Sequence, residues 1–200
     1  MLSWRNRVCW LFDMDGTLTV PAHDFAFARR ELGVPPRADI LGHLATLSTQ
    51  QREVAERWLQ DWEVDIARRS VPQDDALKLV FALQDRGCRL GVLTRNTRDN
   101  ALRTLAAVGM SGCFQPAHVL GRSCAPPKPD PAGIHVLLDR LDSSPDRCVM
   151  VGDYLHDVRA GRRAGAATLL VNRRGESGWD DEADLVVSSL WPLPVELPRS

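Results

Sequence analysis

Lysine and paired cysteine are both scarce in this chain. Of its 25 basic residues only Lys78 and Lys128 are lysines, so arginine occupies nearly every other basic position. The five cysteines are scattered without a Cys-x-x-Cys pair, and their odd number argues against a disulfide framework and against a structural zinc site. We therefore expect a reducing, cytoplasmic location.

Long apolar runs and an excess of one charge are also absent. No apolar run approaches the roughly 20 residues of a transmembrane helix, and the first apolar stretch is too short for a secretory signal peptide. The 25 basic and 26 acidic residues leave a net charge of -1 without a long basic run, which argues against nucleic-acid or membrane partners. We expect a small-molecule partner, and the sequence leaves open whether the chain is a monomer or a homodimer.

The remaining pattern is that of an α/β protein. Hydrophobic residues make up 44% of the 200 residues, enough for one domain with a small inserted module. Apolar runs predict strands, and segments of helical periodicity lie between most of them. This alternation predicts a Rossmann-like, three-layer fold with a parallel sheet covered on both faces. The strands are expected at 8–12, 88–93, 148–151, 168–171 and 185–187, and the helices at 72–85, 98–108, 131–141 and 158–163.

The segment 20–70 interrupts this alternation, because it contains helical patterns but no convincing strand. We expect it to be a small helical cap inserted into a core made of residues 1–19 and 71–200. The last cap helix, 50–69, carries an apolar stripe at i, i+4 spacing: Val54, Trp58, Trp62 and Ile66. Packing between cap helices explains this stripe better than contact with a substrate does.

Two acids follow the first predicted strand. Asp13 and Asp15 are two residues apart, and Gly16 allows the chain to turn sharply after them. Two carboxylates at a turn are typical of a site for a hard cation and a phosphate. A polar turn without function is the alternative for this stretch taken alone.

Two further candidates lie after later strands. Thr94 ends the second strand and is followed by Arg95, and ligands of open α/β sheets bind beyond the carboxyl ends of strands. Capping the next helix is the alternative role for Thr94, although Thr97 is better placed for it. Lys128 lies in a proline-rich turn where a compact ammonium group replaces the usual arginine. A surface lysine of no special role is the alternative.

A second pair of acids follows the third buried strand. Asp153 and Asp157 are four residues apart, which places them on one face of a first helical turn. If they meet Asp13 and Asp15, their mutual repulsion calls for a divalent cation, and Mg²⁺ suits oxygen ligands. Helix capping is the alternative for either residue singly.

Together these motifs resemble the haloacid dehalogenase (HAD) superfamily of phosphohydrolases. The resemblance covers roughly residues 8 to 175 and is closest to the phosphoglycolate phosphatase and phosphosugar phosphatase or mutase branch. Its four motifs stand here in order as Asp13-Met14-Asp15-Gly16-Thr17, Leu93-Thr94, Lys128 before Pro129-Asp130-Pro131, and Gly152-Asp153-Tyr154-Leu155-His156-Asp157.

The resemblance implies a role for each matched position. Asp13 would be the nucleophile that forms an aspartyl-phosphate, and Asp15 the acid and base. Thr94 and Lys128 would bind the phosphoryl oxygens. Mg²⁺ would be held by the Asp13 carboxylate, the Asp15 backbone carbonyl and Asp153, with Asp157 either supporting through water or orienting Lys128. The substrate would be a small phosphorylated metabolite.

Several alternatives stay open at this stage. A short cap and the Arg95-Asn96 pair depart from the phosphoglycolate branch, so either a phosphoglycolate-like compound or a sugar phosphate suits the site. Arg95 is a candidate for binding an anionic group of the substrate, with surface packing as its alternative. A β-phosphoglucomutase-like mutase and a phospho-aspartate signalling switch are the rival functions.

The histidines do not form a site of their own. His23 and His43 lie in the expected helical cap and are candidates for contact with a substrate. His118 and His135 are expected to be structural. His156 belongs to the last motif and is expected to contact the helix surface.

Overall fold

A single parallel sheet of six strands forms the centre of the computed structural model, which describes residues 4–175 and 178–193. The strand order is β3-β2-β1-β4-β5-β6, and every neighbouring pair is parallel. The strands are β1 Cys9–Phe12, β2 Arg89–Leu93, β3 Val119–Leu120, β4 Cys148–Gly152, β5 Ala167–Val171 and β6 Leu185–Val187. Because all residues of β1, β4 and β5 are buried, these strands are continuous apolar runs, as a sheet covered on both faces requires. The predicted α/β fold is confirmed.

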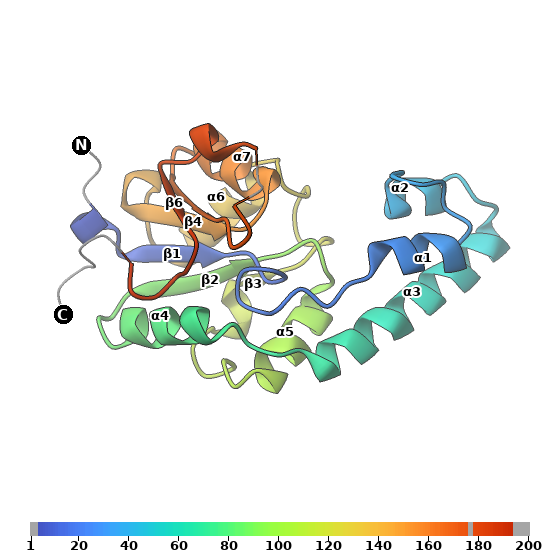
Figure 1. Ribbon diagram of the computed structural model, residues 1–200, viewed down its shortest axis with the longest axis horizontal. Coiled ribbons are helices and arrows are strands. Elements are labelled where there is room, and N and C mark those ends of the chain that lie inside the picture. Colours follow the sequence, from blue (N-terminus) through green and yellow to red (C-terminus); the bar gives the residue numbers. More distant parts are fainter. Residues whose placement is uncertain (1–3, 176–177, 194–200) are drawn as a thin grey trace.

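Four helices cover the two faces of this sheet (Figure 1). The helices α4 Asp74–Gln84 and α5 Arg98–Ala107 pack their apolar sides on one face, and α6 Ala132–Arg140 and α7 Leu155–Ala164 pack on the other. Single 3₁₀ turns also occur in the core: η1 Trp4–Asn6, η2 Pro116–His118, η3 Pro145–Arg147 and η4 Asp180–Glu182.

The predicted core elements match these observed ones closely, with two differences. The strand β3 was not predicted, because two residues are too few to show a pattern. The helix α7 begins at Leu155 rather than Val158, since the Asp157 carboxylate accepts a hydrogen bond from the Tyr154 N–H at 3.1 Å and so caps an earlier turn.

The strand order places three strand ends side by side. Strand β1 lies between β2 and β4, and its last residue, Phe12, is in register with Val92 of β2 and Val151 of β4. The chain moves from β1 to one side of the sheet and later returns to the other side, and this change of direction opens a crevice beyond the strand ends. The residues that follow β1, β2 and β4 therefore share one edge.

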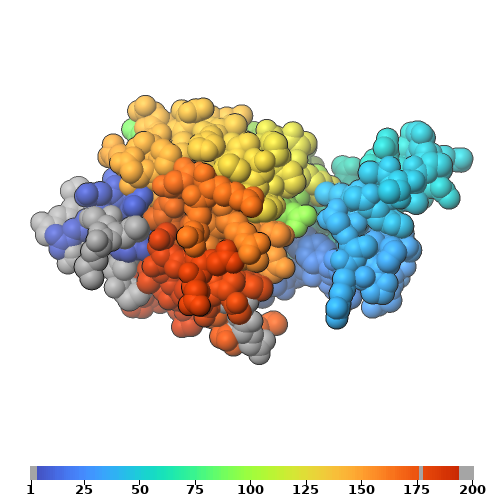
Figure 2. Space-filling view, turned by 90° about the horizontal axis from the view of Figure 1, so that it is seen from above, coloured from blue at the N-terminus to red at the C-terminus, as the bar shows by residue number. Residues whose placement is uncertain are grey.

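The segment 20–70, which we call the cap segment, forms a separate helical lobe beyond this edge (Figures 1 and 2). Its helices are α1 Phe25–Glu31, α2 Ile40–Leu44 and α3 Thr49–Arg69. The side chains of Asp24, Asp39 and Ser48 cap their N-termini. A small apolar cluster holds them together: Ala28, Val34, Ile40, Leu44 and Leu59. No described helix is both long and apolar enough to cross a membrane, including the 21-residue α3.

The buried face of α3 differs from the predicted stripe. Val54 is 63% exposed, so its predicted place in the packed stripe was wrong. The buried residues of the helix are Leu59, Glu63, Ile66 and Ala67. Trp58 packs against Phe27 of α1 and stacks on Trp62, with ring centroids 6.0 Å apart in both pairs. The preferred interpretation of the tryptophans, packing between cap helices, agrees with these contacts.

The two connections between the cap segment and the core run side by side. The Val20 N–H donates to the Val71 carbonyl at 2.9 Å, and Thr19 pairs with Pro72 in an antiparallel bridge. The cap segment therefore leaves and re-enters the core at one place.

Candidate active site

The turn after β1 carries the first two acids of the site. The Asp13 N–H donates to the Val151 carbonyl at 2.9 Å, which continues the β1–β4 pairing one residue beyond the strand. Gly16 has a φ of 84° and faces the Asp153 carboxylate so closely that a Cβ atom would overlap it. Glycine at this position therefore permits both the left-handed turn and the approach of the fourth strand's acid.

Lys128 connects two of the carboxylates. Its Nζ atom lies 2.5 Å from Asp13 Oδ1 and 2.6 Å from Asp157 Oδ1, and the side chain is 3% exposed. The turn before α6 thus delivers a buried ammonium group between the acid after β1 and the acid in the first turn of α7. Its two partners explain why a compact point charge, rather than a planar guanidinium, occupies the position.

Three acids converge around this ammonium group. Asp13, Asp153 and Asp157 each offer an oxygen atom, and these atoms all lie within 4.8 Å of one another. Burial, opposed by Lys128 and reinforced by the charges of Asp157 and Asp153, raises the pKa of Asp13 to about 7. Burial and the charge of Asp157 raise the pKa of Asp153 to about 6. One ammonium group therefore does not offset the negative charge of this cluster.

The lysine itself stays protonated. Burial lowers the pKa of Lys128, but the charges and hydrogen bonds of Asp13 and Asp157 outweigh burial and raise it above its usual value. Lys128 therefore offers a permanent positive charge to an incoming anion.

Thr94 lies at the end of β2 and is buried. Its hydroxyl oxygen accepts a hydrogen bond from the Asn96 N–H at 3.1 Å, which leaves its O–H hydrogen for another acceptor. The hydroxyl of Thr97, not that of Thr94, caps α5 by accepting the Asn100 N–H at 3.2 Å. Thr97 therefore takes the capping role that was the alternative for Thr94.

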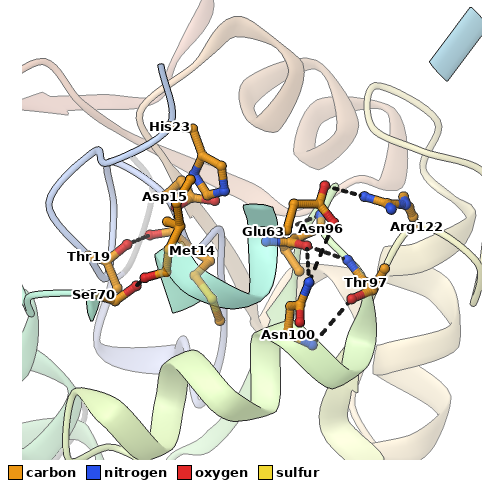
Figure 3. Close-up of polar contacts among 12 residues, drawn as sticks. Met14, Asp15, Thr19, His23, Glu63, Ser70, Asn96, Thr97, Asn100 and Arg122 are labelled. Atoms are coloured by element: carbon orange, nitrogen blue, oxygen red, sulfur yellow. Dashed lines mark hydrogen bonds and ion pairs between the residues drawn. The ribbon is translucent and has the colours of Figure 1, made fainter. Parts of the chain in front are cut away.

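Asp15 meets a histidine from the cap segment (Figure 3). His23 Nδ1 lies 3.1 Å from Asp15 Oδ1. Burial lowers the pKa of His23, but its contact with Asp15 and the charges of Asp15 and Glu63 outweigh burial, so that the pKa is raised. His23 stacks on Phe25 and meets the edge of Trp62, which fixes it to the base of the cap segment.

A cavity of about 610 Å³ joins the strand ends to the cap segment. All the predicted site residues line it: Asp13, Asp15, Thr94, Arg95, Lys128, Asp153 and Asp157. His23 and His156 line it as well, whereas the structure places His43, His118 and His135 outside the lining residues. The cap segment contributes Phe25, Arg29, Arg37 and Ile40 to the opposite wall.

Sequence reasoning missed the charges that join this wall to the core. Glu63 of α3 lies 2.6 Å from Arg122, and Asp39 lies 3.5 Å from Arg95. In both pairs the cap segment supplies the acid and the core supplies the arginine, and all four side chains line the cavity. An acid on an otherwise apolar helix face was the signal available for Glu63, whereas Arg122 gave none among so many arginines.

The site can be compared with known proteins. The family model described as haloacid dehalogenase-like hydrolase matches residues 9–165. A haloacid dehalogenase-like hydrolase domain-containing protein of Arabidopsis thaliana, At2g33255, is 32% identical over 194 residues, which cover 91% of this chain and 76% of that protein. A phosphoglycolate phosphatase of Rhodospirillum rubrum is 35% identical over 147 residues, covering 74% of this chain and 57% of the phosphatase.

Solved structures agree with the fold. The crystal structure of a β-phosphoglucomutase from Clostridium difficile superposes with a TM-score of 0.74 at 18% identity, over 92% of this chain and 91% of that one. At this identity the likeness concerns the fold alone.

Proposed function

The chain belongs to the haloacid dehalogenase-like hydrolases and is an enzyme of the phosphatase type within that family, and we propose that it is a Mg²⁺-dependent phosphomonoesterase acting on a small phosphorylated metabolite. One observation carries the proposal. Lys128 lies between Asp13 and Asp157 at the strand ends, with Asp153 in the same cluster, at the bottom of a cavity that the cap segment closes.

The acidic cluster fits a divalent metal ion. Three carboxylates and one ammonium group leave surplus negative charge, and the raised pKa values of Asp13 and Asp153 express it. The carboxylates of Asp13 and Asp153 and the backbone carbonyl of Asp15 would hold the ion, and Asp157 would support it. Bound Mg²⁺ would supply charge neutralisation for a phosphoryl group next to these acids.

Asp13 and Asp15 have different roles in the proposed reaction. The Asp13 carboxylate attacks the phosphorus atom, the bond to the leaving oxygen breaks, and an aspartyl-phosphate forms. Asp15 lines the cavity two residues away, gives a proton to the leaving oxygen and then takes one from the water that hydrolyses the intermediate. The contact with His23 holds the Asp15 side chain on the cavity side of the turn.

Lys128 and Thr94 hold the transferred group. Both are buried at the cavity floor, so their positions are fixed before the substrate arrives. Preorganised donors of this kind stabilise charge that develops on phosphoryl oxygens during transfer. Asp157 keeps the Lys128 ammonium group directed toward Asp13.

The remainder of the cavity favours a substrate with a second polar or anionic group. Arg29, Arg37 and Arg95 also line it, and guanidinium groups pair well with carboxylates and phosphates. A phosphoglycolate-like compound would use these arginines directly, and a sugar phosphate would place hydroxyl groups there. In the mutase alternative the phosphoryl group would be transferred to a sugar instead of water, and the same residues at the cavity floor would be used.

Phosphate release from a panel of metabolites tests the proposal. The panel contains phosphoglycolate, several sugar phosphates and acetyl phosphate, with and without Mg²⁺, for the native chain and for Asp13→Asn. We expect release that requires both the metal and Asp13, and the preferred compound identifies the branch. Equal phosphate release by Asp13→Asn and the native chain would show that Asp13 is not the nucleophile. Conversion of one sugar phosphate into another without phosphate release would identify a mutase.

We also place the enzyme in the cytoplasm. The five cysteines are free, and Cys9 and Cys148 lie buried on neighbouring strands without a disulfide between them, which supports a reducing environment.

A further inference from the structure

Glu63 is a charged residue on the buried face of a helix. On α3 it follows Leu59, which belongs to the apolar cluster of the cap segment, and precedes Ile66 and Ala67, which are buried. Residues four apart share one helix face. Glu63 therefore lies where this face passes from the cap cluster to the base of the helix, and its side chain is 9% exposed.

Two separate core segments supply its partners (Figure 3). Arg122, two residues beyond β3, places Nη1 2.6 Å from Glu63 Oε1, and Asn100, in α5, donates from Nδ2 to Glu63 Oε2 at 3.4 Å. Asn100 is buried as well. Each carboxylate oxygen thus meets a different part of the core, both away from the paired connections at Thr19 and Pro72.

Further hydrogen bonds connect these partners to Thr94, the residue directly after β2. The Asn100 amide also donates to Asn96 Oδ1 at 3.4 Å, and the Arg122 N–H donates to the Asn96 carbonyl at 2.9 Å. The Asn96 N–H in turn donates to the Thr94 hydroxyl oxygen. A continuous set of hydrogen bonds therefore joins α3 of the cap segment to Thr94.

The two core loops in this set have little freedom to shift separately. A Cβ atom on Gly121 would overlap the backbone of both Asn96 and Arg98, so the loop after β3 rests directly on the loop after β2. Movement of Arg122 is therefore transmitted to the segment that carries Thr94.

The energetics of this contact favour a role in geometry. A buried ion pair adds little net stability compared with apolar packing, but removing one partner leaves a buried charge and is costly. An apolar residue at position 63 would have stabilised α3 equally well. A charge pair with fixed partners instead specifies one relative position of the helix and the loops.

We propose that Glu63 is a positioning residue: by binding Arg122 and Asn100 together it fixes the cap segment over the strand ends and holds the Thr94 loop in its phosphoryl-binding position. The inference rests on the proposed phosphatase function for its kinetic consequence, although the contact itself does not. Glu63 and Arg122 line the same cavity as the arginines of the cap segment and the acids of the floor. By fixing the cap segment, the pair also fixes the position of the cap-segment arginines, which would select the substrate, relative to Asp13, which would react with it.

The kinetic test compares Glu63→Gln with Glu53→Gln. Glu53 lies on the same helix but is exposed, so its substitution is a chemically matched control. Each variant is assayed with the best metabolite of the panel and with acetyl phosphate, which has no second anionic group for the arginines of the cap segment. We expect Glu63→Gln to raise KM for the metabolite about 10-fold, the equivalent of 1.4 kcal/mol. With acetyl phosphate we expect a smaller loss, a fall in kcat of about twofold, because this substrate depends on the Thr94 loop but not on the arginines of the cap segment.

A double-mutant cycle distinguishes this role from a purely structural one. If the pair acts as a unit, Glu63→Gln combined with Arg122→Gln raises KM for the metabolite no further than either change alone. Equal losses with both substrates, accompanied by a lower melting temperature, would overturn the positioning role. So would kinetics identical to those of Glu53→Gln.

A readout independent of turnover separates failure of this inference from failure of the proposed function. Hydrogen exchange of the native chain and both variants, measured without substrate, reports the contact directly. We expect Glu63→Gln to increase exchange in 94–100 and 120–122, far from the substituted residue in sequence, and Glu53→Gln to leave both segments unchanged. Unchanged exchange in both segments for Glu63→Gln would refute the inference even if the phosphatase activity is found.

Discussion

The core and the cap segment are stabilised by very different amounts of buried apolar surface. In the core, both faces of the sheet are covered by helices, and three strands are buried along their whole length. In the cap segment, α1 has seven residues, α2 has five, and one small cluster of five buried apolar residues holds them to α3. At about 25 cal/mol per Å² of buried apolar surface, the core has far more stabilisation to spare.

The polar residues of the two regions are arranged accordingly. On the core, the two acids proposed to react, Asp13 and Asp15, follow directly from the end of β1, whose position is fixed by its pairing with β2 and β4. On the cap segment, charged side chains reach across to core arginines. From this difference we expect substitutions in the core to affect the reaction with every substrate, and substitutions in the cap segment to affect which substrate is bound. The expected effects are largest at the core residues and smallest at the rim of the cavity.

The largest effect is expected from the core residue proposed to react. Asp13→Asn should reduce kcat by at least about 10⁴-fold for every substrate, because it removes the nucleophile. The melting temperature at pH 8 should not fall, since burial disfavours the charged carboxylate, as the raised pKa of about 7 indicates. Stopped assays and thermal unfolding measure the two quantities. A loss confined to one substrate would contradict the division between core and cap.

Lys128 should matter for stability as well as activity. Lys128→Ala leaves Asp13 and Asp157 buried without their counter-charge, so the free energy of unfolding should fall by about 3–5 kcal/mol. Mg²⁺ should recover part of this loss. The control is Lys78→Ala, at the chain's other lysine, which is exposed and should change stability by at most about 0.5 kcal/mol. Urea denaturation with and without Mg²⁺ measures both losses. Equal losses of unfolding free energy for Lys128→Ala and Lys78→Ala would contradict the prediction.

The same truncation should have different consequences in the two apolar clusters. Leu79→Ala, in the core, should lower the free energy of global unfolding by about 2–5 kcal/mol. Leu44→Ala, in the cap cluster, should affect global unfolding less and instead speed hydrogen exchange in α1 to α3. Both leucines are almost fully buried, so exposure does not explain the difference. Equal global losses would show that the lobe and the core unfold as one unit.

A polar contact within the core should depend on pH. Burial raises the pKa of Asp75, but hydrogen bonds from Arg173, Ser189 and the Leu190 N–H outweigh burial, and the pKa is lowered. The contact therefore stabilises the fold above the unfolded-state pKa of about 3.9, and this stabilisation is lost as the pH falls through the folded-state value.

Asp75→Asn should accordingly destabilise the protein by about 1–3 kcal/mol at pH 7. The difference from native should shrink toward zero as the pH falls through the lowered folded-state pKa of Asp75. Urea denaturation across this range tests the sign. The exposed neighbour Asp74 provides the control, with an expected loss of at most about 1 kcal/mol from the helix dipole. A difference that grows on acidification would contradict the assignment.

The smallest effect is expected at the rim of the cavity. Arg95 and Asp39 are both about half exposed, so breaking their contact should change stability by at most about 0.5 kcal/mol. Arg95→Gln should nevertheless raise KM about threefold for a substrate with a second anionic group. Asp39→Asn removes the same ion pair but keeps Arg95 and the helix cap, so it should not raise KM. A rise with both variants would assign the effect to the ion pair and not to substrate binding.

The sequence predicted the core well for a physical reason. Continuous apolar runs such as Val149 to Val151 are buried on both faces, and a parallel sheet brings the carboxyl ends of its strands to one edge. The residue pattern was therefore sufficient to place the acids after β1 and β4 near each other. Strand β3, with two residues, carries too little pattern for the same inference.

The contacts of the cap segment could not be predicted in the same way. On α3, Trp58 and Leu59 are neighbours about 100° apart on the helix, and composition did not decide which of the two faces is buried. Glu63 and Arg122 are 59 residues apart, and nothing local to either residue indicates the other. Such pairings depend on how two preformed regions meet.

The central claim is that Asp13 carries the phosphoryl group during turnover, and trapping the intermediate tests it most directly. The native chain is mixed with Mg²⁺ and the best substrate of the panel, quenched in acid within milliseconds, digested and analysed by mass spectrometry. The account predicts one added phosphoryl group on the peptide that contains Asp13, and none in Asp13→Asn. Phosphate release by the native chain with that peptide unmodified at every time point, or with the label on another residue, would contradict it.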